Sequence, residues 1–229
     1  MSKGAELQNE RELNDNLDFL EKEIVTLLVN DKMFKEVGGI ISGNSVVNHK
    51  NSFYDWMVSA YISDVTIRIR RLVDEDQSVK SFVNFLKELK GHQHFRTRDY
   101  HVNFYKDNFV LEGIGNNTFD GLAGVGASVY DEILVQKDID DLKAECFKIV
   151  LFTHNYIAHT NRKIVDNGGS EKVKIPTFTD LENAIRHVDK LLIKYFLLLR
   201  AVGKGESLMP HWQYNWKSIF EVPWMQKPL

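Results

Sequence analysis

Apolar residues recur every three to four positions along most of this chain, which is the spacing of one face of an α-helix. On this pattern we expect helices over about residues 10–37, 52–73, 79–89, 138–162 and 179–203. The last segment shows the pattern most clearly, with apolar positions three and four apart at Leu181, Ala184, Val188, Leu191, Tyr195, Leu198 and Val202. The chain is therefore predicted to be all-α, a bundle of about five to six helices.

Helix start and stop signals place the ends of these segments. We expect the pair Gly38-Gly39 to end the first helix, and Ser78 to cap the third. Asp138 is predicted to cap the fourth, where a carboxylate meets the positive end of the helix dipole. The segment Thr179-Asp-Leu-Glu182 has the spacing of a capping box and is predicted to open the last helix.

Two segments depart from the helical pattern, namely residues 91–126 and the C-terminal residues 205–229. Residues 91–126 combine histidines, aromatic residues and five glycines from Gly113 onward, for which we expect loops and short helices. The run from Gly121 to Gly126 superficially resembles a phosphate loop, but no strand precedes it, so loop or helix-packing glycines are the better interpretation.

We divide the chain into a bundle over residues 1–204 and an aromatic-rich C-terminal tail over 205–229. This tail is predicted to pack on the bundle or to contact a partner.

Composition limits the class of protein. Hydrophobic residues make up 43% of the chain and aromatic residues 11%, as in globular proteins. The net charge of −3 gives no overall electrostatic signal for nucleic acid, so an RNA contact requires a local patch. With one cysteine, Cys146, no intrachain disulfide can form, and this thiol is predicted to lie in the core. Since no signal peptide or bilayer-spanning run is present, we expect a cytoplasmic protein without a membrane contact.

The candidate chemistry lies in the segment from Cys146 to Lys163. At ~100° per residue, one apolar stripe contains Leu142, Cys146, Ile149, Thr153 and Tyr156, and is widened by Phe147, Val150, Leu151, Ile157 and Ala158. The opposite, polar strip contains Glu145, Lys148, Asn155, His159, Arg162 and Lys163. His154 is expected nearer the apolar side. The helix is therefore predicted to be buried on much of its circumference, as in the centre of a bundle.

Two interpretations of the polar strip are open. In the functional one, His159 is a general acid or base, Asn155 one turn away orients it, and a neighbouring cation stabilises negative charge on phosphate. In the other, the histidine is hydrogen-bonded in a helix interface, and the basic residues Arg162 and Lys163 interact favourably with the C-terminal end of the helix dipole.

The segment Asn155-Tyr156-Ile157-Ala158-His159 resembles the signature of the HEPN superfamily, in which an arginine and a polar residue precede a histidine. The wider layout, over about residues 10–203, is similar to the abortive-infection AbiU-type branch. The shared features are a helix with Trp56 that runs into Arg70-Arg-Leu-Val-Asp74, a short helix from Ser78, and Pro176-Thr-Phe-Thr-Asp180 before a long helix.

This resemblance implies a helical, homodimeric protein of toxin–antitoxin or phage-defence systems, with RNA and a cognate toxin or antitoxin as partners. It implies a metal-independent endoribonuclease with a composite site at the dimer interface and no cofactor. His159 would transfer protons and Asn155 would orient it. The arginine of the signature is replaced here by His154, so the phosphate contact would fall to His154, Arg162 or Lys163. A histidine is mostly neutral at pH 7 and has fewer donors than arginine.

The lost arginine leaves alternatives open. One is an active ribonuclease, and another is an inactive RNA- or protein-binding module, such as the regulatory partner of a toxin. A third is that the Asn-x3-His match is coincidental. RNA binding with a steep salt dependence would separate the first two from the third.

Further candidate residues lie outside this segment. Asp64 interrupts an otherwise apolar row and is predicted to pair with Arg68 or to reach His159 or His154 as a supporting carboxylate. Arg68, Arg70 and Arg71 cluster near a helix end, where either the helix dipole or an RNA contact accounts for them. A final set is predicted to be a solvated loop, with a phosphate or metal contact as the alternatives: His92, His94, Arg96, Arg98 and His101.

Overall fold

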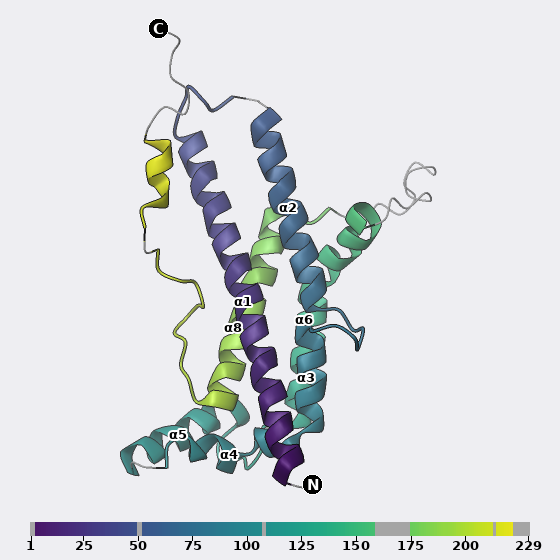
Figure 1. Ribbon diagram of the computed structural model, residues 1–229, viewed down its shortest axis with the longest axis vertical. Helices are drawn as coiled ribbons and strands as arrows, with labels where there is room; N and C mark the ends of the chain where they lie inside the picture. Colours follow the sequence, from purple (N-terminus) through teal and green to yellow (C-terminus); the bar gives the residue numbers. More distant parts are fainter. Residues whose placement is uncertain (1–2, 50–51, 107–108, 159–174, 213, 222–229) are drawn as a thin grey trace.

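The computed structural model describes residues 3–49, 52–106, 109–158, 175–212 and 214–221 (Figure 1). In these segments the regular structure is helical, and the one extended pairing is an isolated antiparallel bridge between Thr97 and Val129. The predicted all-α class is confirmed. The principal helices are α1 (Lys3–Ser42), α2 (Ser52–Leu72), α3 (Phe82–Gly91), α4 (Arg98–Asn103), α5 (Phe109–Ala123), α6 (Glu132–Phe152) and α8 (Phe178–Arg200).

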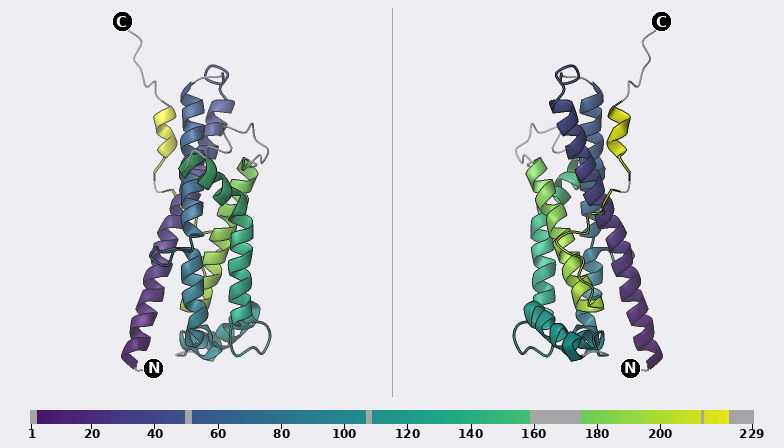
Figure 2. Two further views of the ribbon diagram at one scale, coloured as in Figure 1. Left: turned by 90° about the vertical axis from the view of Figure 1, so that its right-hand side faces the viewer. Right: turned by 90° about the vertical axis from the view of Figure 1, so that its left-hand side faces the viewer.

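The long helices pack side by side as a bundle. The two antiparallel helices α1 and α2 stand next to each other, and α3 continues downward from α2 (Figure 1). Behind them, α6 packs against α2, α3 and α8, while α8 packs against α1 and α6. The short helices α4 and α5 lie across one end of the bundle, as two side views show (Figure 2). Helix α6 packs on three neighbouring helices but leaves one side open, so the prediction of a central helix that is buried on much of its circumference is wrong.

The core follows the predicted apolar stripes closely in α8 and partly in α6. In α8, Leu181, Ala184, Val188, Leu191, Tyr195 and Leu198 are all buried. The last residue of the predicted stripe, Val202, lies after the end of α8 and is 42% exposed, so its placement was wrong. In α6, Leu142, Cys146 and Ile149 are buried, and so is Thr153 directly after it, as the helical pattern predicts. Burial raises the pKa of the Cys146 thiol to about 12, so this thiol stays protonated and packs as a hydrophobic residue.

Three predicted helix starts are wrong, two of them by about one turn or more. The third helix is capped by Ser81, whose hydroxyl accepts from the Asn84 N–H at 3.0 Å, and Ser78 lies before it. Helix α6 begins after Asp131, whose carboxylate accepts from the Ile133 N–H at 2.8 Å. The capping box of α8 likewise uses Thr177 with Asp180, rather than Thr179 with Glu182.

Asp138, the predicted cap, instead holds α6 to α8. Its carboxylate accepts from the Lys194 ammonium at 2.7 and 2.9 Å and from the hydroxyls of Tyr195 at 2.7 Å and Tyr130 at 2.9 Å. Both tyrosines are buried. The sequence could not distinguish this role from capping, because its partners lie far away along the chain.

The first helix does not end at Gly38-Gly39 but runs through both glycines to Ser42. A glycine inside a helix costs only about 1 kcal/mol, and tertiary contacts can exceed that. Phe34 stacks on Tyr61 of α2, with ring centroids 3.9 Å apart. Packing of α1 against α2 therefore extends the helix beyond its local stop signal.

Two residues of the set predicted as a solvated loop, Arg96 and His101, are instead part of the core, whereas His94 is exposed. Arg96 is 3% exposed, and its guanidinium donates to the carbonyl oxygens of Leu89, Lys90 and Tyr130. His101 is fully buried, with Nδ1 3.0 Å from the Leu198 carbonyl oxygen, and burial lowers its pKa. The described residues contain no group of three or more side chains that could hold a metal ion.

The glycines near residue 124 form a turn, as expected. Helix α5 ends at Ala123, and Gly124 and Gly126 adopt φ of 101° and 74°, a region that favours glycine. The carboxylate of Asp120 accepts from the Gly126 N–H at 3.0 Å. The turn therefore ends a helix, and no phosphate loop is formed there.

After α8 the chain reverses and runs back beside α1 (Figure 1). We call residues 201–212 the strap. Lys204 pairs with Glu21 at 2.8 Å, and the Leu208 N–H donates to the buried Asp189 carboxylate at 2.9 Å. Farther on, the Lys32 ammonium lies 5.6 Å from the Trp212 ring centroid. Among the described residues, no helix combines the length and the apolar character that crossing a bilayer requires.

Candidate functional site

The predicted motif lies where α6 changes its geometry. Helix α6 ends at Phe152 and continues as the π-helical segment η2 (Thr153–Ala158). The buried Thr153 hydroxyl donates to the Ile149 carbonyl at 2.7 Å and lies 3.3 Å from the Thr66 carbonyl oxygen of α2. Wide turns of this kind inside helices occur frequently at functional sites. The motif therefore begins at a point that is anchored to a neighbouring helix.

The wide turn changes which side chains face the core. Asn155, predicted on the polar strip, is only 8% exposed, and its amide donates to the Leu151 carbonyl at 2.8 Å. Tyr156, predicted on the apolar stripe, is 43% exposed and stacks on Phe152 with ring centroids 5.4 Å apart. His154, expected nearer the apolar side, is exposed. These placements were predicted wrongly, because i→i+5 bonding adds residues to the turn and shifts the 3.6-residue pattern.

Three predicted site residues, His159, Arg162 and Lys163, lie outside the described residues. The contact between Asn155 and His159 stays a prediction, and so does the role of either cation at a phosphate. What the structure places is the anchored start of the motif, His154 and Asn155, beside α2.

The supporting carboxylate belongs to an interface between α1 and α2. Asp64 accepts from Arg68 Nε at 2.9 Å and from Asn30 Nδ2 at 2.7 Å. Arg68 Nη1 also lies 3.3 Å from Glu23, and Arg71 Nη1 lies 3.7 Å from the same carboxylate. The predicted Asp64–Arg68 pair is confirmed. Arg68 is consequently neutralised by two carboxylates, which argues against a contact with RNA phosphate at this residue.

The third arginine of the cluster has a different environment. Arg70 forms no ion pair with a carboxylate of the described residues. It follows Thr66 by four residues, and therefore lies on the same side of α2 as the carbonyl that meets Thr153. Sequence reasoning could not single out Arg70 within the cluster, because only the tertiary ion pairs distinguish the three arginines.

The end of α6 also exposes apolar side chains. Phe147 is 65% exposed and Leu151, one turn later, is 38% exposed. Both were predicted to widen the buried stripe, and this prediction is wrong, because no helix of the described residues covers this side of α6. Contiguous exposed apolar side chains of this kind are typical of interfaces.

Comparisons with models of protein families, with curated proteins and with solved structures find no match. The resemblance to the HEPN superfamily therefore stays a prediction from the residues of the motif and their order.

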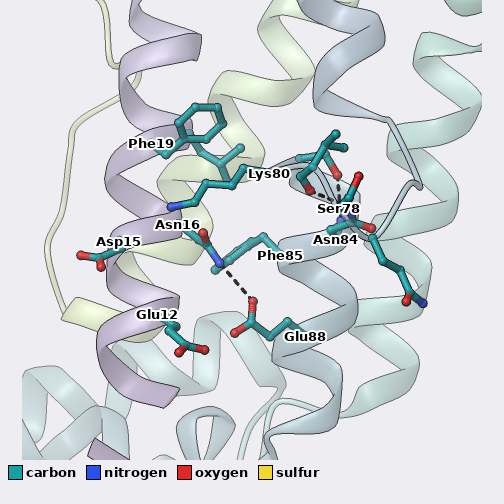
Figure 3. A pocket seen from close by; sticks show the side chains of 13 residues that line it. Glu12, Asp15, Asn16, Phe19, Ser78, Lys80, Asn84, Phe85 and Glu88 are labelled. Atoms are coloured by element: carbon teal, nitrogen blue, oxygen red, sulfur yellow. Dashed lines mark hydrogen bonds between the residues drawn. The ribbon is translucent and has the colours of Figure 1, made fainter. Parts of the chain in front are cut away.

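A second candidate site is a groove of 380 Å³ between α1 and α3 (Figure 3). Three carboxylates line it, those of Glu12, Asp15 and Glu88, with Asn16 donating to Glu88 at 3.0 Å. The Lys80 ammonium lies at its rim, 5.9 Å from the centroid of the Phe19 ring. Burial, together with the nearby charge of Glu12, raises the pKa of Glu88. A groove with this excess of negative charge disfavours phosphate, so it is not the RNA site.

Proposed function

We propose that this chain is a HEPN-like protein of a prokaryotic defence or toxin–antitoxin system and acts as a metal-independent endoribonuclease. The observation that carries the proposal is the position of His154 and Asn155, the described start of the motif, in η2 directly after α6. Thr153 anchors the start of this segment to α2, and exposed apolar side chains flank it. A motif that joins the core to an interface is well placed to form a shared site.

The proposal includes a homodimer that brings the ends of two α6 helices together. Phe147 and Leu151 support this interface, because burying them against a second copy removes apolar surface from water. Two motif segments would then border one cleft. An RNA strand bound in that cleft would meet a histidine from each protomer.

Each residue of the motif has a defined role in this scheme. His159 takes a proton from the attacking 2′-hydroxyl or gives one to the leaving oxygen, and Asn155 orients it. His154, Arg162 or Lys163 contacts the phosphate, where donors that stabilise the developing charge speed the reaction. Arg70, on the side of α2 that meets η2, is a further candidate for RNA contact. Asp64 and Arg68 hold α1 and α2 together.

A second function is favoured by a specific observation, the histidine at position 154 where the signature has arginine. A neutral imidazole stabilises phosphate less than a guanidinium does. The same fold without catalysis would be an RNA- or protein-binding module, for example the regulatory partner of a cognate toxin. The net charge of −3 agrees better with a protein partner than with RNA.

Cleavage of a mixed RNA substrate in the presence of EDTA tests the two functions. If the chain is a ribonuclease, His159→Ala should reduce the cleavage rate by about 10²- to 10⁴-fold, the usual contribution of a general acid or base. His154→Arg restores the arginine of the signature and should increase the rate, because a permanent cation then contacts the phosphate.

His211→Ala is the matched control, since His211 is an exposed histidine of the tail. Cleavage that survives His159→Ala would contradict the enzymatic proposal. Absence of cleavage in both the wild type and His154→Arg, with RNA binding retained, would support the binding module instead.

A further inference from the structure

A second groove, of 660 Å³, lies between α1, α8 and the strap. It is formed by elements other than the α2–α6 face, so its role is independent of the proposed function. Charged side chains from α1 and α8 line it, together with Gly205, Glu206 and Ser207 of the strap.

Three of the four carboxylates of this groove, those of Asp31, Glu182 and Asp189, already have partners, and the fourth, that of Glu206, is exposed on the strap. Lys35 pairs with Asp31 at 2.7 Å and with Glu182 at 2.9 Å. The Tyr61 hydroxyl donates to Asp31 at 2.7 Å, and the Leu208 N–H donates to the buried Asp189 carboxylate. The carboxylates of Asp31, Glu182 and Asp189 are therefore engaged in contacts within the protein.

Two cations of the groove lack such partners. Arg186 and Lys190 are exposed on successive turns of α8 and form no ion pair or hydrogen bond with the described residues. Glu182 precedes Arg186 by one turn, a spacing at which helical ion pairs commonly form. Its carboxylate is bonded to Lys35 instead. The guanidinium and the ammonium are therefore available to an anion in the groove.

The strap adds backbone donors to the same place. Gly205 adopts φ of 77°, and the N–H groups of Gly205, Glu206 and Ser207 donate to no acceptor in the described part of the protein. The backbone N–H of the following residue, Leu208, donates to the Asp189 carboxylate of α8. This hydrogen bond holds the strap against the helix next to these amides. Backbone amides beside cationic side chains are a common way to bind phosphate.

We propose that this groove binds a phosphorylated small molecule, with its phosphoryl oxygens bonded by Arg186, Lys190 and the strap amides. A phosphoryl group carries about −1.5 to −2 charges at pH 7 and three acceptor oxygens, which matches two cations and a set of N–H donors. Apolar side chains of Leu28, Ile185 and Ile193 line the groove and would contact the rest of the ligand. The volume accommodates more than a phosphate ion alone.

Calorimetric titration with tripolyphosphate and with AMP tests this site, with adenosine as the uncharged comparison. We expect the two phosphates to bind and adenosine not to bind. The double variant Arg186→Gln and Lys190→Gln should weaken binding by about tenfold or more, because each charge-assisted hydrogen bond contributes substantially to affinity. Both positions are exposed, and circular dichroism would verify that the variant folds.

Lys137→Gln is the matched control, because Lys137 is an exposed lysine of α6 that does not line the groove. Equal binding of phosphates to the wild type and to the double variant would overturn the proposal, as would no binding to either. A short single-stranded RNA provides the last arm. If the double variant loses RNA binding while free phosphates never bind, the groove holds an RNA backbone and the small-molecule proposal is wrong.

Discussion

At the residue scale, Arg96 shows how one side chain can join distant segments. Its guanidinium lies in the core and bonds the last carbonyls of α3 together with the carbonyl of Tyr130. The negative end of the α3 dipole favours a cation there. A planar group with five donors suits three separate carbonyl oxygens, whereas the ammonium of lysine is a compact point charge.

We therefore expect Arg96→Lys to lower the free energy of unfolding by roughly 2–4 kcal/mol, because buried carbonyls lose charged donors. Urea denaturation monitored by circular dichroism measures the change. Arg70→Lys is the control and should shift the value by less than about 0.5 kcal/mol, as most surface substitutions do. Equal midpoints for the two variants would show that Arg96 contributes no specific stabilisation.

At the element scale, the structure differs most from the sequence-based predictions at the ends of the helices. Helix α8 ends at Arg200, and Ala201, which caps it, adopts the left-handed conformation with φ of 53° and ψ of 29°. Glycine normally occupies this position, because a Cβ is strained there. The next residues form the strap, so the conformation of Ala201 sets the direction in which the chain returns along α1.

Ala201→Gly should increase the free energy of unfolding by about 0.5–1 kcal/mol, since it removes the strain of a left-handed alanine. Thermal denaturation measures this change. The matched control is Ala144→Gly, on the exposed side of α6, which should destabilise by about 1 kcal/mol. The same sign in both variants would contradict the interpretation that Ala201 is strained.

The sequence predicted the interiors of these elements better than their ends. The stripe of α8 could be read directly, since each buried position repeats at a fixed spacing. The extension of α1 past its two glycines could not, because the stacking of Phe34 on Tyr61 joins residues that are distant along the chain. The change from α- to π-helical geometry at Thr153 could not be predicted from the sequence either. It reversed the expected placement of Asn155 and Tyr156.

At the scale of the whole molecule, the bundle leaves the end of α6 open on one side. Phe147 and Leu151 are exposed there, next to the start of the motif. The proposed homodimer would cover this surface and would bring two motif segments together. The proposed assembly and the proposed ribonuclease site are therefore linked, and a test of one bears on the other.

Substituting glutamate at both positions, Phe147→Glu with Leu151→Glu, should convert a dimer to a monomer, because charged groups are costly to bury without partners. Sedimentation velocity measures the mass. Val125→Glu is the control, since Val125 is an exposed apolar residue in the turn after α5. A wild type that sediments as a monomer, or a dimer that persists in the double variant, would rule out this interface.

The sequence by itself determined the all-helical class, the buried stripe of α8 and the segment where a histidine and an asparagine could do chemistry. These features depend on the spacing of residue types along the chain, which can be read from the sequence alone. Only the tertiary structure decided that Arg68 is neutralised while Arg70 is not, that Asp138 joins α6 to α8, and that Arg186 and Lys190 border a groove. Such differences arise from partners distant along the chain, because burial and ion pairing depend on which helices meet.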